Sequence, residues 1–182
     1  TLLIVSTRTM KQSVILLLLL PSTQNKENYY MCRYTENVAL RGKATQSHRI
    51  QHPFGAAYNA IDGNRNPNAN AGSCTHTIQQ NNPWWRVDLL DTYVITSVVI
   101  TNRGDCCPER INGARVHIGN SLQDNGAANP VCTVISSIPA GATQSFQCNG
   151  MNGRYVNVVI PGRKEYLTLC EVEVYGSRLD LV

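Results

Sequence analysis

The stretch VITSVVIT, residues 94–101, runs directly into NRGDCCPER, residues 102–110. Its first part largely alternates apolar and polar residues, as a strand with one buried face does. The second part brings together Gly, Pro and charged residues, which favour loops over regular strands. We therefore expect a strong strand that ends in a loop at one edge of a β-structure.

The same strand pattern recurs along the rest of the chain. Turn formers such as Asn112-Gly113 and Asn149-Gly150 separate the segments, and no stretch shows the periodicity of a helix. From residue 36 onward there is no linker, charge run or internal repeat. The sequence therefore predicts one all-β domain, an antiparallel β-sandwich or jelly roll. The expected strands are 86–89, 94–101, 114–118, 131–135, 143–147, 154–160 and 167–175.

The two tryptophans, Trp84 and Trp85, lead into one of these strands. Alternation places Arg86 and Asp88 on one face of the strand and the apolar residues 87 and 89 on the other. This pattern favours a core aromatic residue and a structural Arg86/Asp88 pair over a ligand site.

Charge and cysteine content limit the class of function. The net charge is +4, but Lys and Arg are scattered, whereas nucleic-acid binding requires a clustered basic face or regularly spaced aromatics. Nucleic acid is therefore not an expected partner. Seven cysteines in 182 residues indicate an oxidising compartment.

A leader is expected within residues 1–28. Met10-Lys11 precedes an apolar run over residues 14–20 and then Pro21-Ser22-Thr23, which is the pattern of a signal peptide. The run is far shorter than the roughly 20 apolar residues of a transmembrane helix. We expect a secreted, extracellular protein without membrane insertion.

The loop after residue 101 carries the chemistry. Arg103 and Arg110 flank the adjacent pair Cys106-Cys107. Each guanidinium offers a rigid fork of donors that suits vicinal sugar hydroxyls. If the two cysteines bond to each other they form a compact apolar platform; if each bonds to a distant cysteine they do not, and spacing alone leaves both possibilities open.

From Glu36-Asn37-Val38-Ala39 to residues 169–174, LCEVEV, the chain resembles the F-type lectin family, and within it the eel fucolectins, also called eel agglutinins. The resemblance covers roughly residues 34–176, and we place the lectin domain at 34–178. The family motif is a His, a long interval, then Arg-Gly-Asp and a second Arg beyond a Cys-Cys pair. Here these are His76, Arg103 and Arg110.

What the resemblance implies is a discoidin-like β-sandwich that binds L-fucose and is not an enzyme. His76, Arg103 and Arg110 would hydrogen-bond the axial 4-hydroxyl and neighbouring oxygens of the sugar. Cys106 and Cys107 would bond to each other and contact the sugar ring. We further hypothesise that Asp105 and Glu109 orient the two arginines.

The resemblance also implies a structural calcium ion and a set of disulfides. Oxygen donors of the kinds at these positions suit Ca²⁺. The calcium ligands would be Asn59, Asp62, Asn64, Ser73, Cys170 and Glu171. The implied disulfides are Cys74–Cys170, Cys106–Cys107 and Cys132–Cys148, with Cys32 left over as a free thiol, an intermolecular link or a part of the leader.

One stretch departs from the family pattern. Residues 66–71, NPNANA, lack the aromatic residues that would line a pocket for the fucose methyl group. Phe54 or His52 are candidates to replace them. Strict selectivity for fucose is therefore less well supported than the binding of sugar hydroxyls.

Partners and alternative functions follow from the same features. The resemblance implies fucosylated glycans on glycoproteins or microbial surfaces, a role in innate immunity, and a homo-oligomer, a trimer in the eel relatives. The tripeptide Arg103-Gly104-Asp105 could instead bind integrins, but sugar binding would occupy Arg103. A discoidin-like adhesion or phospholipid-binding module is the main alternative, although the loops lack apolar spikes. A glycosidase would need a protonated carboxyl, which arginine neighbours disfavour.

Overall fold

A computed structural model of the chain describes residues 36–51 and 54–179. The expected leader, Cys32 and His52 lie outside these residues. Helices that are long and apolar enough to cross a membrane do not occur in the described part.

Strands and short 3₁₀ helices make up the described residues. The strands are β1 (Glu36–Asn37), β2 (Lys43–Gln46), β3 (Thr75–His76), β4 (Gln80–Asn81), β5 (Trp84–Thr101), β6 (Arg115–Gly119), β7 (Val131–Val134), β8 (Thr143–Val159), β9 (Lys164–Glu165), β10 (Thr168–Leu169) and β11 (Glu171–Arg178). The 3₁₀ helices are η1 (Val38–Arg41), η2 (Ala57–Ala60), η3 (Ala69–Ala71), η4 (Pro108–Ile111) and η5 (Gln123–Gly126).

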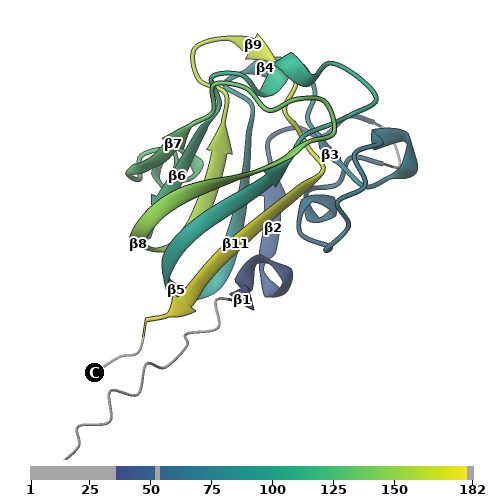
Figure 1. Cartoon of the computed structure of the whole chain (residues 1–182). Coiled ribbons are helices and arrows are strands. Elements are labelled where there is room, and N and C mark those ends of the chain that lie inside the picture. Colours follow the sequence, from purple (N-terminus) through teal and green to yellow (C-terminus); the bar gives the residue numbers. More distant parts are fainter. Residues whose placement is uncertain (1–35, 52–53, 180–182) are drawn as a thin grey trace, which may run out of the picture. The chain divides into compact units, whose positions relative to one another are not determined.

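The fold is organised around the long antiparallel pair β5–β8 (Figure 1). The main sheet has the order β1-β11-β5-β8-β6-β7, and β2 also pairs with β5. Every pairing between named strands is antiparallel. The all-β antiparallel architecture expected from the sequence is confirmed.

The β5–β8 pair bends near its middle. The register shifts between Asp88 and Tyr93, and Leu90 has a left-handed backbone with φ 69°. The part of β5 before the bend pairs with β2, whereas the part after it pairs with β11. Side chains from both parts, Trp85 and Val87 before the bend and Val98 and Ile100 after it, lie in one buried cluster. The bend therefore turns one long ribbon into two layers around a single core.

The bend changes several sequence-based boundaries. The strands expected at 86–89 and 94–101 are one strand, as are those expected at 143–147 and 154–160. The strand expected at 167–175 is divided at Cys170 into β10 and β11. Alternation placed Val87 and Leu89 correctly on a buried face, but Glu171 and Glu173, on the polar side of the alternation in β11, are buried as well. Alternation also does not reveal a bulge that keeps two segments hydrogen-bonded to the same partner.

The expected pair of Arg86 and Asp88 is wrong. Asp88 accepts two hydrogen bonds from Arg154 on β8, at 2.7 and 2.8 Å, while the Arg86 guanidinium lies over the Trp84 and Tyr155 rings. Residues i and i+2 of one strand are almost 7 Å apart, farther than neighbours on adjacent strands, so the cross-strand partner is preferred. The expected core aromatic is Trp85, whose side chain is fully buried.

The segment between β8 and β11 connects the two ends of β5. Trp84 is opposite Val159, and Thr101 is opposite Glu171, so residues 160–170 connect the two ends. Within this segment β9 pairs with β4 and β10 pairs with β3. The loops that carry the predicted site residues therefore gather at this end of the domain.

Candidate functional site

His76 is fixed by its backbone and by its ring. Its amide N–H donates to the Gly55 carbonyl at 3.1 Å, and its own strand β3 pairs with β10. The ring nitrogen Nδ1 lies 2.7 Å from the Thr77 carbonyl oxygen. A carbonyl can only accept, so Nδ1 carries the proton, and in the neutral imidazole Nε2 is the acceptor nitrogen. In this tautomer Nε2 is the ring nitrogen that can accept a hydrogen bond.

Arg103 is held by Asp105 in a two-pronged ion pair. Its Nε and Nη2 donate to the two carboxylate oxygens at 2.9 and 2.7 Å. The same carboxylate accepts from the Ala69 amide at 2.9 Å and from the Asn70 side chain at 3.3 Å. The Arg103 guanidinium lowers the pKa of Asp105 to about 2. Arg103 therefore has a fixed orientation relative to the 69–70 loop, with further N–H groups left over for a ligand.

Arg110 reaches the site through Tyr166, an aromatic residue that the sequence analysis missed. Its guanidinium lies over the Tyr166 ring, 4.6 Å from the centroid. The edge of the same ring meets His76, with the two centroids 5.5 Å apart. The carboxylate beside Arg110 is that of Glu165, with Nε and Oε1 3.8 Å apart. The hypothesis that Asp105 orients Arg103 is confirmed, but Glu165 takes the place expected for Glu109.

Cys106 and Cys107 are bonded to each other. Cys107 has a left-handed backbone, φ 54°, and begins the turn into η4. This disulfide gives the expected platform between Arg103 and Arg110 in the chain. The implied Cys74–Cys170 and Cys132–Cys148 disulfides are also present.

A cavity of about 150 Å³ lies beside His76 and Arg103, and we call it the His76 cavity. Phe54, which is 42% exposed, forms part of its wall. Gly72 makes room for that ring, because a Cβ at this position would lie 2.8 Å from a ring carbon of Phe54. Phe54 therefore supplies the aromatic surface that residues 66–71 lack. The lining residues are Ile50, Phe54, Gly55, Ala69, Asn70, Cys74, His76 and Arg103.

Only some of the predicted site residues line the same cavity. His76 and Arg103 line one cavity, while Arg110 joins them through the shared Tyr166 ring. Cys106 and Cys107 adjoin Arg103 in the chain but are not among the residues that line the cavity. Tyr166 and Glu165 precede a predicted strand, and their sequence context gave no signal of a role at the site.

A second group of predicted residues surrounds the buried carboxylate of Glu171. Its Oε1 accepts from the Gly63 amide at 3.2 Å, whereas Oε2 is buried without a hydrogen-bond partner among the described residues. Burial, with a smaller effect of Asp62, raises the pKa of Glu171 to about 7. An orphaned buried carboxylate oxygen is costly unless a cation or donor compensates it.

The other predicted calcium ligands lie in the same loops. Asp62 accepts from the Asn64 amide at 2.9 Å, and Ser73 donates to the carbonyls of residues 66 and 68 at 2.6 and 3.0 Å. Asn59 donates to the carbonyls of residues 72 and 74 at 2.8 and 3.1 Å, next to the Cys74–Cys170 bridge. Carboxylate, hydroxyl and carbonyl oxygens are the donors that Ca²⁺ prefers. The residues present fit such an ion.

Comparisons with known proteins show which chains this protein is similar to. A family model described as a NedA-like, galactose-binding domain matches residues 59–158. Fucolectin-4 of Anguilla japonica is 60% identical over 143 residues, covering 76% of this chain and 79% of that protein. The crystal structure of an f-lectin (fucolectin) from the serum of the striped bass, Morone saxatilis, has a TM-score of 0.78 and 65% identity.

The share of the matched chain that is covered differs between the solved structures. The match to the striped bass lectin covers 79% of this chain and 50% of that one, so this chain spans half its length. The lectin domain of Lectinolysin, solved in complex with the Lewis B antigen, is 32% identical with a TM-score of 0.68. That match covers 79% of this chain and 98% of the other.

Proposed function

This chain belongs to the fucolectin family, and we propose that it is a lectin that binds terminal L-fucose on glycans. The observation that carries the proposal is the Arg103–Asp105 clamp beside His76, at the edge of a cavity with one aromatic wall. The proposal combines this geometry with the names of the relatives.

Each side chain has a role that its chemistry supports. Arg103 and Arg110 donate to the axial 4-hydroxyl and its neighbours, because a guanidinium has donors and no acceptors. His76 accepts through Nε2, since Nδ1 donates to Thr77. Phe54 covers the fucose methyl group. Preorganised donors avoid much of the entropy that would be lost if flexible side chains were ordered on binding.

The function proposed is binding rather than catalysis. A glycosidase needs a carboxyl group that stays protonated near neutral pH to act as the general acid. The pKa of Asp105 is instead lowered to about 2 by Arg103.

We extend the proposal to a structural calcium ion held by the six residues predicted for it. The ion would compensate the buried Glu171 carboxylate and would tie the loop around Asp62 to the start of β11. It would support the His76 cavity from behind, through the Cys74–Cys170 bridge, without contacting the sugar.

Secretion and clustering complete the proposal. All six described cysteines are in disulfides, which supports an extracellular location. Assembly into a homo-oligomer such as a trimer would raise avidity for fucosylated glycoproteins or microbial surfaces through multivalency. Such recognition would suit innate immunity.

A glycan array tests the central proposal. Fucosylated glycans should retain the protein above matched glycans that lack fucose. Arg103→Ala should reduce L-fucose affinity by about 100-fold, since the charged hydrogen bonds and the clamp are both lost. Arg178→Ala, at the far end of β11, is the matched control and should bind normally. Equal retention of fucosylated and unfucosylated glycans would overturn the proposal.

A further inference from the structure

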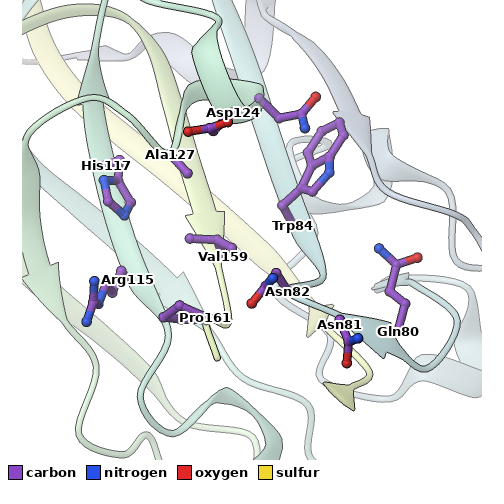
Figure 2. Close-up of a pocket in the computed structure, with 11 residues that line it drawn as sticks. Gln80, Asn81, Asn82, Trp84, Arg115, His117, Asp124, Ala127, Val159 and Pro161 are labelled. Atoms are coloured by element: carbon purple, nitrogen blue, oxygen red, sulfur yellow. The ribbon is translucent and has the colours of Figure 1, made fainter. Parts of the chain in front are cut away.

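A larger hollow of about 540 Å³ shares no lining residue with the His76 cavity, and we call it the Trp84 groove (Figure 2). Arg115 and His117 of β6 lie along one side of it, and Trp84, Asn82 and Gln80 lie along the other, with Val159 between them. Asp124 projects from the η5 turn at one end. The lining residues are Gln80, Asn81, Asn82, Trp84, Arg115, His117, Asp124, Asn125, Ala127, Val159 and Pro161.

The walls of the groove combine one indole ring with many uncharged polar groups. Four amide side chains supply donors and acceptors together, and the positive Arg115 is offset by the negative Asp124. An anionic ligand would favour clustered cations, whereas an apolar ligand would leave the amides unpaired. A neutral saccharide fits, because its hydroxyls both donate and accept and one face of its ring is apolar.

His117 is a largely buried polar residue in the groove wall, and this placement indicates that the groove binds a ligand. Only 6% of the residue is exposed, and its Nδ1 donates to the Asn129 carbonyl at 2.7 Å. In the neutral tautomer that carries the proton on Nδ1, Nε2 is the acceptor nitrogen, and His117 forms part of the groove wall. A ring nitrogen that can accept, placed in this wall, is suited to a ligand hydroxyl.

Trp84 is held in place and is shared by two hollows. The Arg86 guanidinium lies 5.4 Å from its ring centroid, and its amide donates to the Ser47 hydroxyl at 3.2 Å. A second hollow of about 460 Å³, which also contains Gln80, lies against Trp84 on the side of residues 46–49. The Trp84 ring is therefore held in a fixed position between two hollows, which together are longer than one sugar.

Three chain segments join the groove to the candidate fucose site. His76 and Gln80 belong to the first. Arg110 and Arg115 belong to the second, and Pro161 and Tyr166 to the third. Across the β4–β9 ladder Gln80 is opposite Glu165, whose carboxylate lies beside Arg110. Neighbouring strands lie about 5 Å apart, so this ladder is a short step between the two places.

From this juxtaposition we propose that the Trp84 groove binds a neutral inner sugar of the same glycan whose terminal fucose occupies the His76 cavity. Trp84 stacks on the sugar ring, while Gln80, Asn82 and His117 hydrogen-bond its hydroxyls. The inference rests on the proposed function, because the fucose determines where the inner sugar lies.

The two tryptophans of the chain provide the test. Only the Trp84 indole lies in the groove, whereas Trp85 is fully buried and donates to the Ala57 carbonyl at 2.9 Å. In ¹⁵N–¹H spectra the Lewis b oligosaccharide should shift the Trp84 indole signal and leave that of Trp85 in place. L-Fucose alone should shift neither. A Trp84 shift with L-fucose alone, or no Trp84 shift with bound Lewis b, would contradict the proposal.

Calorimetry provides a second test, in which the affinities for Lewis b and for L-fucose are compared. The wild type should bind Lewis b about tenfold more tightly than L-fucose, and Trp84→Ala should abolish that advantage without changing L-fucose affinity. Trp84→Phe should restore most of it. If Trp84→Ala unfolds, Gln80→Ala, which removes one of the proposed hydrogen bonds at a half-buried side chain, should reduce the advantage about threefold. An undiminished advantage in these variants would refute the groove, whereas failure of the wild type to bind L-fucose would refute the fucose site itself.

Discussion

The His76 cavity and the Trp84 groove share no lining residue, and their walls differ in chemistry. The cavity has charged side chains locked by an ion pair and supported by a disulfide, and it is about 150 Å³ in volume. The groove is about 540 Å³ and is lined mainly by amides around one indole ring. A small, locked site suits one terminal sugar, whereas an open amide-rich site suits weaker contacts with varied inner sugars. We infer that the cavity sets whether a glycan binds and the groove sets which glycan binds best.

The largest loss of glycan affinity among these predictions is expected when Asp105 is changed. Asp105→Asn removes the charge and one acceptor from the Arg103 clamp and loosens the 69–70 loop. We expect L-fucose and longer glycans to lose the same factor, about 10- to 100-fold, by calorimetry. Glu109→Gln in the same loop is the control and should bind normally. A loss confined to long glycans would reverse the roles of the two sites.

Removal of the calcium ion that we propose should lower the stability of the domain. With the ion at about 100 times its dissociation constant, binding contributes about 2.7 kcal/mol to the free energy of unfolding. Chelation should therefore lower the melting temperature by about 5–10 °C in a thermal scan. Glu171→Gln should abolish the response to calcium, whereas Glu173→Gln should keep it. A wild type with equal melting temperatures in calcium and in chelator would exclude the ion.

A smaller effect is expected at Phe54. Phe54→Ala should weaken L-fucose binding about fourfold, as expected for one buried methyl group. Binding of D-arabinose, which lacks the methyl carbon, should change little. Competition assays with both sugars measure the ratio. If both affinities fell equally, Phe54 would contribute to the shape of the cavity and not to selectivity for the methyl group.

The smallest effect concerns pH. The pKa of Asp105 is depressed in the folded protein, so its contribution to stability is complete above the ordinary pKa of an aspartate, near 4, and is lost as the pH falls toward about 2. Urea denaturation should give the same difference between wild type and Asp105→Asn at pH 7 and pH 5, and a smaller one at pH 3. A difference that grew on acidification would contradict the clamp.

Sequence patterns predicted the polar side of the site better than its apolar side. Arg103 and Asp105 are two residues apart in a recognisable loop, and their contact needs only local geometry. Phe54 was a candidate from the sequence and does line the cavity, whereas Tyr166 reaches the site through the β3–β10 and β4–β9 pairings, which strands of only two residues do not reveal. The same limit applies to the fold, since alternation identified the buried Val87 and Leu89 but neither the bulge near Leu90 nor the burial of Glu171 and Glu173.

The edge pairing of β1 with β11 has a consequence for evolution. Glu36 lies opposite Gly176, so the two ends of the described domain leave it side by side, away from β3 and β4 (Figure 1). A domain with this layout can be inserted into or duplicated within a larger polypeptide without blocking its ligand sites. Gene fusion and tandem repetition therefore cost the fold little.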